Sequence, residues 1–338
     1  MQPPIERNPQ VTFAMVAYNQ DQFIEAAIRS ALDQDYSPLE VLIFDDASID
    51  QTYQIAQKLA SEYKGHHTIK VKQNQRNLGI VGNVNAVLSA SKGEIIILAA
   101  GDDISVPERS SRIVDFWKNN GRPSFIYSGT VRIDEYGHSL TRARPNNMLS
   151  DDTSVLDFLR FWPNVTGAAS AIHKDIFETF GPLGSTTEVE DRNFALRGIL
   201  LNGAKYLNED LVQYRVSGIS DSHAVSKTIP AKLAHRRREM QWIRSFYQQA
   251  REDLEAAHQR SDDLPWEQLA NLCENKIEVA NFILQLLSSG WASRIAATGR
   301  AISVARKTSE KTALRELLKL TTIYAMYGCQ DDREASLK

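Results

Sequence analysis

The chain has 338 residues, with 39 lysines and arginines against 42 aspartates and glutamates and a formal net charge of −3 at pH 7. This length allows one large domain, or a domain with a further region attached. The near balance of charge argues against nucleic-acid binding through a wholly basic surface. Cys273 and Cys329 lie in apolar helical contexts without metal-ligand spacing, which indicates packing residues in a reducing compartment.

The start of the chain is polar over residues 1–10 and lacks the apolar core of a signal peptide. No stretch approaches the roughly 20 apolar residues that a membrane-spanning helix needs. We therefore expect a protein of the cytoplasm, or one that is peripheral to a membrane.

The first hundred residues alternate between strand and helix patterns. Apolar strands are predicted at 11–17, 41–44, 68–73 and 95–99, and helices at 24–32, 52–63 and around 83–88. Four successive strand–helix units predict a parallel sheet with right-handed crossovers.

The stretch from Lys92 to Pro107 is the most informative part of the sequence. Five uninterrupted apolar residues are followed by Gly101, Asp102 and Asp103. A run without polar alternation is typical of a strand covered on both faces, and the carboxyl ends of such strands face the ligand crevice of an α/β sheet. The two carboxylates would therefore meet a metal and an anionic substrate. The alternative is that an aspartate caps a helix over residues 106–119.

The second half of the chain changes rhythm. We predict strand segments at 125–128 and 131–134 with a hairpin turn at 135–138. A helix at 153–161, a strand at 168–173, a helix opening at 188–191 and ending at 201, and short strands at 204–207 and 211–216 are predicted after it. Acids in the first turn of a helix commonly interact with its dipole and nothing else, which is the plain alternative for Glu188.

From about Pro230 the sequence predicts helix throughout. The last two predicted helices cover 291–307 and 308–327, and residues 291–319 contain seven basic side chains against two acidic ones. A basic amphipathic surface of this kind would bind an anionic membrane. A solvated helix face or a homo-oligomer contact is the alternative.

Two nucleotide-binding motifs are missing from the sequence. A dinucleotide site needs a glycine-rich turn after the first strand, where this chain has Ala17, Tyr18, Asn19 and Gln20, and there is no phosphate-binding loop ending in Gly-Lys-Ser/Thr. The predicted strand ends instead offer amides and carboxylates, which suit a nucleobase, a ribose and a metal-bridged diphosphate. These residues are Asn19, Asp45, Asp46, Asp102 and Asp103.

Five segments together carry a family resemblance. They read VTFAMVAYNQ, EVLIFDDASIDQT, NLGIVGNVNAVLSASKGEIIILAAGDDISVPER, GAASAIHKDIFETFG, and EDRNFALRGI with LVQYRV. In this order and spacing, over roughly residues 10–220, they resemble the family-two inverting glycosyltransferases of the GT-A fold, most of all the bacterial enzymes that build surface polysaccharide. The resemblance implies an α/β catalytic domain over residues 1–225, with a mixed, mainly parallel sheet flanked by helices. An all-α region over 226–338 would follow, for packing, oligomer or membrane-surface contact.

The resemblance implies a donor site for a nucleotide, expected to be uridine, and a divalent cation, Mg²⁺ or Mn²⁺. Asp102 corresponds to the last aspartate of the family's Asp-x-Asp metal motif, whose first aspartate falls at Ala100 here. Because Mg²⁺ commonly takes only one or two protein carboxylates, Asp102 with Asp103 would still hold a metal-diphosphate. Where relatives place a histidine this chain has Ser217, and His223 is either a substitute metal ligand or a surface histidine. The residues implied at the base and ribose are Ala17, Tyr18, Asn19, Asp45 and Asp46.

The resemblance also assigns the reaction. Asp191 corresponds to the aspartate of the family's Glu-Asp catalytic motif and would be the general base, with Gly167, Glu190 and His173 near the acceptor. In-line attack would invert the anomeric carbon without a covalent enzyme intermediate. The expected partners are a nucleotide-diphosphate sugar, expected to be a UDP-sugar, and a saccharide acceptor. A lipid-linked acceptor would place the protein at the inner face of the cell membrane.

Two other functions are compatible with parts of the sequence. Ala100 and Ser217 leave open a non-catalytic nucleotide-sugar-binding or scaffold protein descended from such enzymes. A nucleotidyltransferase that makes activated sugars is expected to carry a glycine-rich basic loop near its amino terminus, and this sequence has none.

Overall fold

The computed structural model describes residues 7–143, 149–150, 153–161, 163–216, 229–261 and 263–288. The chain divides into two compact units. The first unit comprises Met1–His223 together with Gln249–Trp266, and the second comprises Ala224–Gln248 and Glu267–Lys338.

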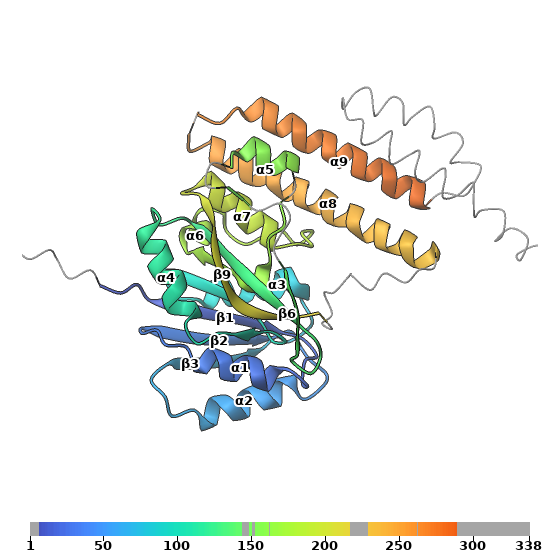
Figure 1. The fold of residues 1–338 in the computed structure, drawn as a ribbon. Helices are drawn as coiled ribbons and strands as arrows, with labels where there is room; N and C mark the ends of the chain where they lie inside the picture. Colours follow the sequence, from blue (N-terminus) through green and yellow to red (C-terminus); the bar gives the residue numbers. More distant parts are fainter. Residues whose placement is uncertain are drawn as a thin grey trace, which may run out of the picture. The chain divides into compact units, whose positions relative to one another are not determined.

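The first unit begins with the predicted alternation of strands and helices. Its elements are β1 (Val11–Ala17), α1 (Ile24–Leu32), β2 (Leu39–Asp45), α2 (Thr52–Glu62), β3 (Thr68–Gln73), α3 (Gly79–Ala90) and β4 (Ile95–Ala100). The four strands are all parallel and lie in the order β3-β2-β1-β4. Figure 1 labels β3, β2 and β1 next to one another. The prediction of a parallel sheet is confirmed for this half.

The second half of the unit extends the same sheet. Its elements are β5 (Ile104–Ser105), α4 (Arg109–Asn119), β6 (Phe125–Ile133), β7 (Ser139–Ala143), α5 (Val155–Phe161), the 3-10 turn η1 (Gly167–Ala169), β8 (Ser170–His173), α6 (Asp175–Phe180), α7 (Asp191–Leu200) and β9 (Ala204–Arg215). The strand order continues β4-β8-β6-β9-β5, and β7 pairs with β6. Because β8 is antiparallel to both of its neighbours, the sheet as a whole is mixed.

Strand β9 differs from the prediction of two short strands. It is a single strand that pairs in parallel with β6 along its length, and the register between them shifts on both sides of Gly129. A Cβ added to Gly129 would lie 2.5 Å from Oδ1 of Asp210 and 3.0 Å from the backbone oxygen of Glu209, so a side chain here would have to displace the Asp210 carboxylate. The register shift interrupts the alternation of apolar and polar residues in the sequence, although both strands continue through it. For the same reason the two segments predicted at 125–128 and 131–134 form one strand, β6, while the predicted turn at 135–138 does connect β6 to the antiparallel β7.

Helices cover the sheet on both faces. Side chains at alternate positions of β1, β2 and β4 pack against α1, α2 and α4, while α3 and α7 pack on the opposite face. Burial on both sides explains the uninterrupted apolar run of β4, whose residues from Ile95 to Ala99 are all buried.

The remaining described elements are two long helices, α8 (Ile229–His258) and α9 (Trp266–Ser288). The second unit has an apolar cluster of its own, made of Met240, Val279, Phe282, Ile283, Leu286 and Leu287. Cys273 is a free, buried thiol on α9, whereas Cys329 and the basic helices predicted beyond residue 290 lie outside the described residues. Within the described ranges, no helix has the length and apolar character required to cross a bilayer.

Candidate active site

The carboxyl ends of three central strands meet at one edge of the sheet. Ala17, the last residue of β1, pairs with Asp45 of β2, and Val16 pairs with Ala100 of β4. The loops that follow these strands therefore start side by side. This register brings together the predicted donor residues of all three strands.

Asn19 connects the loops after β1 and β2. Its Oδ1 accepts a hydrogen bond from the backbone N–H of Ile49 at 2.9 Å, and its own N–H donates to Oγ of Ser48 at 2.8 Å. Its φ of +50° lies in the left-handed region, which asparagine tolerates better than most residues. Asn19 thus holds the two loops in place relative to each other.

The adjacent aspartates Asp45 and Asp46 are both buried and both hydrogen-bonded to neighbouring loops. Asp45 accepts from the backbone and the hydroxyl of Ser48, and from Nε2 of Gln73 at 2.9 Å. Oδ1 of Asp46 accepts from Nδ2 of Asn74 at 2.9 Å and from the N–H of Leu78 at 2.8 Å. The pair therefore shapes the loops that a nucleotide at this edge would touch.

Gly101 is required by the close approach of the loop after β1. A Cβ at this position would lie 2.6 Å from Oε1 of Gln20 and 2.8 Å from both Cβ of Ala17 and Cδ1 of Ile24. Any side chain here would push the loops apart. The glycine therefore lets the following Asp102 lie against the predicted base-binding residues.

Arg215, at the end of β9, fixes the Asp102–Asp103 turn. Its N–H donates to Oδ1 of Asp103 at 2.8 Å, and its Nε donates to the backbone carbonyl of Asp102 at 2.9 Å. The guanidinium lies 4.5 Å from the centre of the Phe23 ring, and the residue is only 4% exposed. Sequence reasoning assigned Arg215 no role; the one available signal was an arginine at the end of the apolar segment LVQYRV.

The electrostatics of this turn are dominated by burial. Burial raises the pKa of Asp102, while a hydrogen bond from Gln20 and the charge of Arg215 oppose the rise. Burial and the neighbouring Asp102 raise the pKa of Asp103 to about 8, and Arg215 and Arg109 oppose this rise. Burial also lowers the pKa of Arg109 to about 9. The turn thus holds two carboxylates close together, with arginines beside them.

The alternative that this aspartate pair caps the following helix is wrong. Helix α4 begins at Arg109, later than predicted, and its N-cap position is Glu108, which makes no capping side-chain hydrogen bond. The short strand β5 separates the aspartates from the helix and pairs with β9. The carboxylates are therefore free of a capping role.

The donor atoms of the turn fit a divalent cation that shares its coordination with a substrate. Oδ2 of Asp103 is buried without a hydrogen-bond partner, and Asp102 is the adjacent carboxylate. Among the described residues there is no group of three or more His, Cys, Asp or Glu that would enclose an ion. Mg²⁺ and similar ions accept one or two carboxylates and take other ligands from phosphate and water. His223 and Ser217 lie outside the described residues.

Gly167, Glu190 and Asp191 form a second group at the same edge. Strand β8 runs antiparallel to β4, with Ala171 opposite Ile97, so Gly167 lies toward the end of β4 that leads to Asp102. A Cβ on Gly167 would lie 2.6 Å from Oε1 of Glu190 and 3.5 Å from Cβ of Asp191. The structure therefore brings these three predicted residues together.

Glu190 and Asp191 stand at the amino terminus of α7. Asp191 is the first helical residue, and its Oδ1 accepts a hydrogen bond from the N–H of Arg192 at 2.6 Å. Burial raises the pKa of Asp191, against the opposing charge of Arg192. Burial and the charge of Asp191 raise the pKa of Glu190 to about 7. A carboxylate with a raised pKa is a stronger base than an ordinary one, which suits removal of a proton from a hydroxyl.

His173, the other residue expected near the acceptor, does not lie beside Gly167. His173 pairs with Ile95, the first residue of β4, and therefore lies at the opposite end of that strand from Asp102. Its ring stacks on Trp117 with centroids 5.7 Å apart, and its Nδ1 lies 3.0 Å from Oδ1 of Asp175. The antiparallel direction of β8 carries His173 away from the site that Gly167 borders.

The sequence of this chain is similar to those of known glycosyltransferases. The sequence model of the family described as glycosyl transferase family 2 matches residues 12–181, which is more than half of the chain. The chain is 33% identical over 138 residues to a Bacillus subtilis protein named EpsE, covering 41% of this chain and 49% of EpsE. It is 34% identical over 116 residues to the succinoglycan biosynthesis protein ExoO of Rhizobium meliloti, covering 34% of this chain and 32% of ExoO. The matches thus span about half of one relative and about a third of the other.

Solved structures share the fold. The structure of Staphylococcus aureus TarS 1–349 in complex with UDP-GlcNAc superposes with a TM-score of 0.54 at 16% identity, covering 91% of each chain. The mannosyltransferase PcManGT of Pyrobaculum calidifontis, in complex with GDP-Man and Mn²⁺, has a TM-score of 0.51 at 18% identity and covers 96% of this chain and 88% of its own. From the family match, the mixed sheet and these similarities, we conclude that the chain belongs to glycosyl transferase family 2 and has the GT-A fold.

Proposed function

We propose that the protein transfers one sugar from a nucleotide-diphosphate sugar, expected to be a UDP-sugar, to a hydroxyl of a saccharide acceptor in polysaccharide synthesis, with inversion. The observation that carries the proposal is the meeting of the donor loops, the Asp102–Asp103 turn and the Glu190–Asp191 pair at one edge of the sheet. The UDP-GlcNAc in the TarS complex supports the donor class, and the name of ExoO supports the polysaccharide setting.

In the proposed reaction Asp191 is the general base. It takes the proton of the acceptor hydroxyl while the hydroxyl oxygen attacks the anomeric carbon from the face opposite the leaving group. The bond from that carbon to the diphosphate oxygen breaks, and the nucleoside diphosphate leaves with the electron pair. The partly buried position of Asp191 supports this role because desolvation raises the pKa of the carboxyl.

The proposed metal site consists of Asp102 and Asp103. A Mg²⁺ or Mn²⁺ ion bound there would stabilise the negative charge that develops on the departing diphosphate. Arg215 keeps the turn in shape through its bonds to the carbonyl of Asp102 and the carboxylate of Asp103. The Mn²⁺ in the PcManGT complex supports a divalent cation.

The first test is calorimetric titration of UDP into the protein with and without Mn²⁺. Asp102→Ala is expected to lose the Mn²⁺-dependent part of the affinity because the turn then keeps only one of its two carboxylates. Asp115→Asn, an exposed position on α4, serves as the control and should behave like the wild type. If UDP, GDP and dTDP all fail to bind, the donor site is disproved. Binding without turnover of any sugar nucleotide would instead favour the non-catalytic alternative.

The second test addresses the base. Asp191→Asn keeps the size of the side chain and removes its basicity, so kcat for transfer should fall by roughly 10²–10⁴-fold while UDP affinity stays within about twofold. Radiolabelled sugar transfer to a saccharide acceptor would measure the first quantity and calorimetry the second. An Asn variant with wild-type turnover would show that another group accepts the proton.

A further inference from the structure

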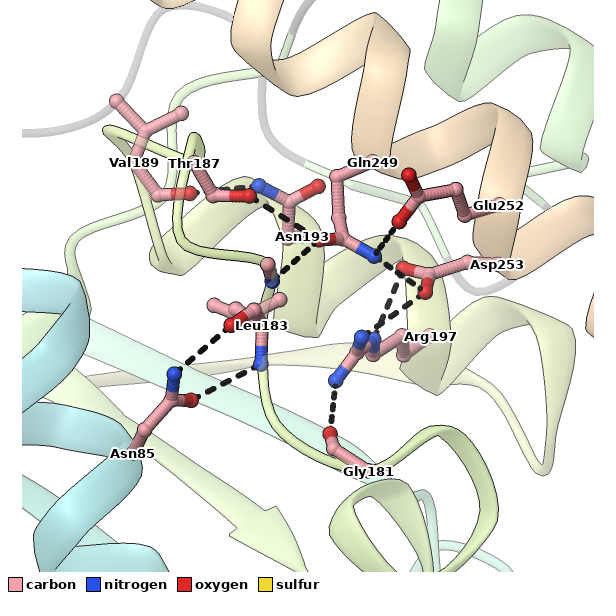
Figure 2. Close-up of polar contacts among 11 residues, drawn as sticks. Asn85, Gly181, Leu183, Thr187, Val189, Asn193, Arg197, Gln249, Glu252 and Asp253 are labelled. Carbon is pink, nitrogen blue, oxygen red and sulfur yellow. Dashed lines mark hydrogen bonds and ion pairs between the residues drawn. The ribbon is translucent and has the colours of Figure 1, made fainter.

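The loop before the Glu190–Asp191 pair, residues 181–190, is held by side chains from three helices (Figure 2). Near the start of the loop, Asn85 of α3 makes two hydrogen bonds to the backbone of Leu183. Oδ1 of Asn85 accepts from the N–H of Leu183, and Nδ2 of Asn85 donates to the carbonyl of Leu183, each at 2.9 Å. At its end, Nδ2 of Asn193 donates to the carbonyl of Val189 at 2.6 Å. Further contacts come from Arg197 of α7 and from α8, whose turns from Gln249 onward belong to the same compact unit as the sheet.

Gln249 is the residue of α8 that contacts this loop directly. Its Oε1 accepts a hydrogen bond from the N–H of Gly184 at 2.7 Å and from the hydroxyl of Thr187 at 3.1 Å (Figure 2). The side chains of Gln249 and Thr187 are both buried. One amide oxygen thus serves two donors, and without it the buried Thr187 hydroxyl would lose an acceptor and the partly buried N–H of Gly184 would lose its anchor.

The Gln249 amide is itself held in one orientation. Its Nε2 donates to Oδ1 of Asp253 at 3.0 Å and to Oε2 of Glu252 at 3.3 Å. Because these acceptors fix the nitrogen, the oxygen of the amide must face Gly184 and Thr187.

A buried ion pair joins this contact to the helix that carries Asp191. Arg197 of α7 is fully buried, and its Nε and one Nη each donate to the Asp253 carboxylate at 2.9 Å. Its other Nη donates to the carbonyl of Gly181, at the start of the loop, at 2.8 Å. The loop, α7 and the end of α8 therefore form one polar network, which Figure 2 shows.

We propose that Gln249 is a positioning residue: it fixes the turn between Gly184 and Thr187 and thereby sets the place of Glu190 and Asp191 beside Gly167. The proposal rests on the proposed function, because it takes Asp191 to be the base. Small displacements of a catalytic group lower the rate strongly, since the reacting atoms must be aligned before the reaction begins. A residue of the C-terminal helices would then be part of what makes the site work.

The first experiment measures the anchor without any turnover. Gln249→Met keeps the volume of the side chain and removes the amide, and its exposed neighbour Gln248→Met is the matched control. Hydrogen–deuterium exchange of peptides covering residues 182–191 is expected to speed up in Gln249→Met alone, with peptides of β1 and β4 unchanged. Unchanged exchange over 182–191 would overturn the proposal.

The second experiment separates positioning from stability. In Gln249→Met, kcat for transfer should fall by about tenfold or more while UDP affinity and the number of UDP-binding sites stay within about twofold. Thr187→Val, which loses the hydroxyl, should lose kcat in the same way, and Thr187→Ser, which keeps it, should retain kcat. A loss of kcat that only matches a loss of binding sites, or equal defects in the two Thr187 variants, would reduce Gln249 to a stability role.

The two proposals fail in different ways. If the wild-type chain transfers no sugar, the proposed function fails, while the exchange rates over 182–191 still decide whether Gln249 holds the loop. If the wild type transfers sugar and Gln249→Met does so equally well, only the positioning role is overturned.

Discussion

Glu190 illustrates how burial sets the properties of a single residue at this site. The side chain stands before α7 with Asp191 and Arg192 as its charged neighbours, and burial and Asp191 raise its pKa to about 7 from an ordinary 4.5. Near neutral pH this residue is therefore partly protonated, next to the proposed base. A carboxyl that can hold a proton there would also donate a hydrogen bond to a substrate hydroxyl.

This shift predicts a pH-dependent contribution to stability. The folded protein holds a proton on Glu190 that the unfolded chain releases above its ordinary pKa, so the stabilisation is complete below about pH 4.5 and is lost as pH rises through about 7. The loss should be about 3 kcal/mol in the free energy of unfolding. Glu190→Gln should remove this component in urea denaturation series between pH 4.5 and 8.

The control for this prediction is Glu62→Gln, at the exposed end of α2. Its stability curve against pH should run parallel to that of the wild type. A Glu190→Gln curve that also runs parallel would show that Glu190 titrates normally in the folded protein.

At the scale of elements, the last strand of the sheet completes the turn that follows β4. Strand β9 lies between β6 and β5 and ends at Arg215, which is 112 positions from Asp103 in the sequence. The guanidinium also donates to the carbonyls of Asp134 and Glu135, in the turn after β6, at 2.5 and 2.9 Å. One side chain thus connects the ends of β4, β6 and β9.

Replacement of Arg215 tests this connection. Arg215→Met leaves several buried oxygens without a donor and the aspartate pair without a nearby cation, so the free energy of unfolding should fall by about 2–4 kcal/mol. Mn²⁺-dependent UDP binding should weaken as well. Arg215→Lys keeps the charge but not the planar fork and should recover only part of both losses. Chemical denaturation and calorimetry measure the two effects.

A surface arginine provides the comparison. Arg29→Ala removes only an exposed i, i+4 pair with Glu25 on α1 and should cost less than about 1 kcal/mol. If Arg215→Met binds UDP with Mn²⁺ as tightly as Arg29→Ala does, the turn after β4 does not depend on Arg215.

At the scale of the whole molecule, the first compact unit extends beyond the predicted boundary at residue 225. It includes residues 249–266, because Asp253 of α8 pairs with the fully buried Arg197 of α7. The apolar cluster of the second unit is separate. The long helix α8 therefore contributes to both units.

This arrangement predicts where the chain can be shortened. A chain ending at residue 225 lacks Asp253 and leaves Arg197 buried without its carboxylate, which should lower the free energy of unfolding by at least about 3 kcal/mol relative to a chain ending at 266. Urea denaturation of the two shortened chains makes the comparison. Equal stability would mean that the catalytic domain closes at residue 225 without α8.

The sequence by itself determined the strand–helix alternation, the doubly covered strand β4, the acidic turn after it and the family. These features are local: burial periodicity, turn residues and motif order are all written in consecutive residues. The motif order also identified Gly167, Glu190 and Asp191, which the structure places together, although their assigned roles remain proposals.

Only the tertiary structure decided the rest. Because β8 is antiparallel to β4, His173 lies at the end of β4 opposite to Asp102. The two strands predicted at 204–207 and 211–216 form one strand, β9, with a register shift opposite Gly129. Arg215 reaches Asp103, and Gln249 reaches Gly184 from 65 positions away. Strand direction, register and buried polar contacts between distant segments depend on how the elements pack, and no local pattern in a single sequence contains that information.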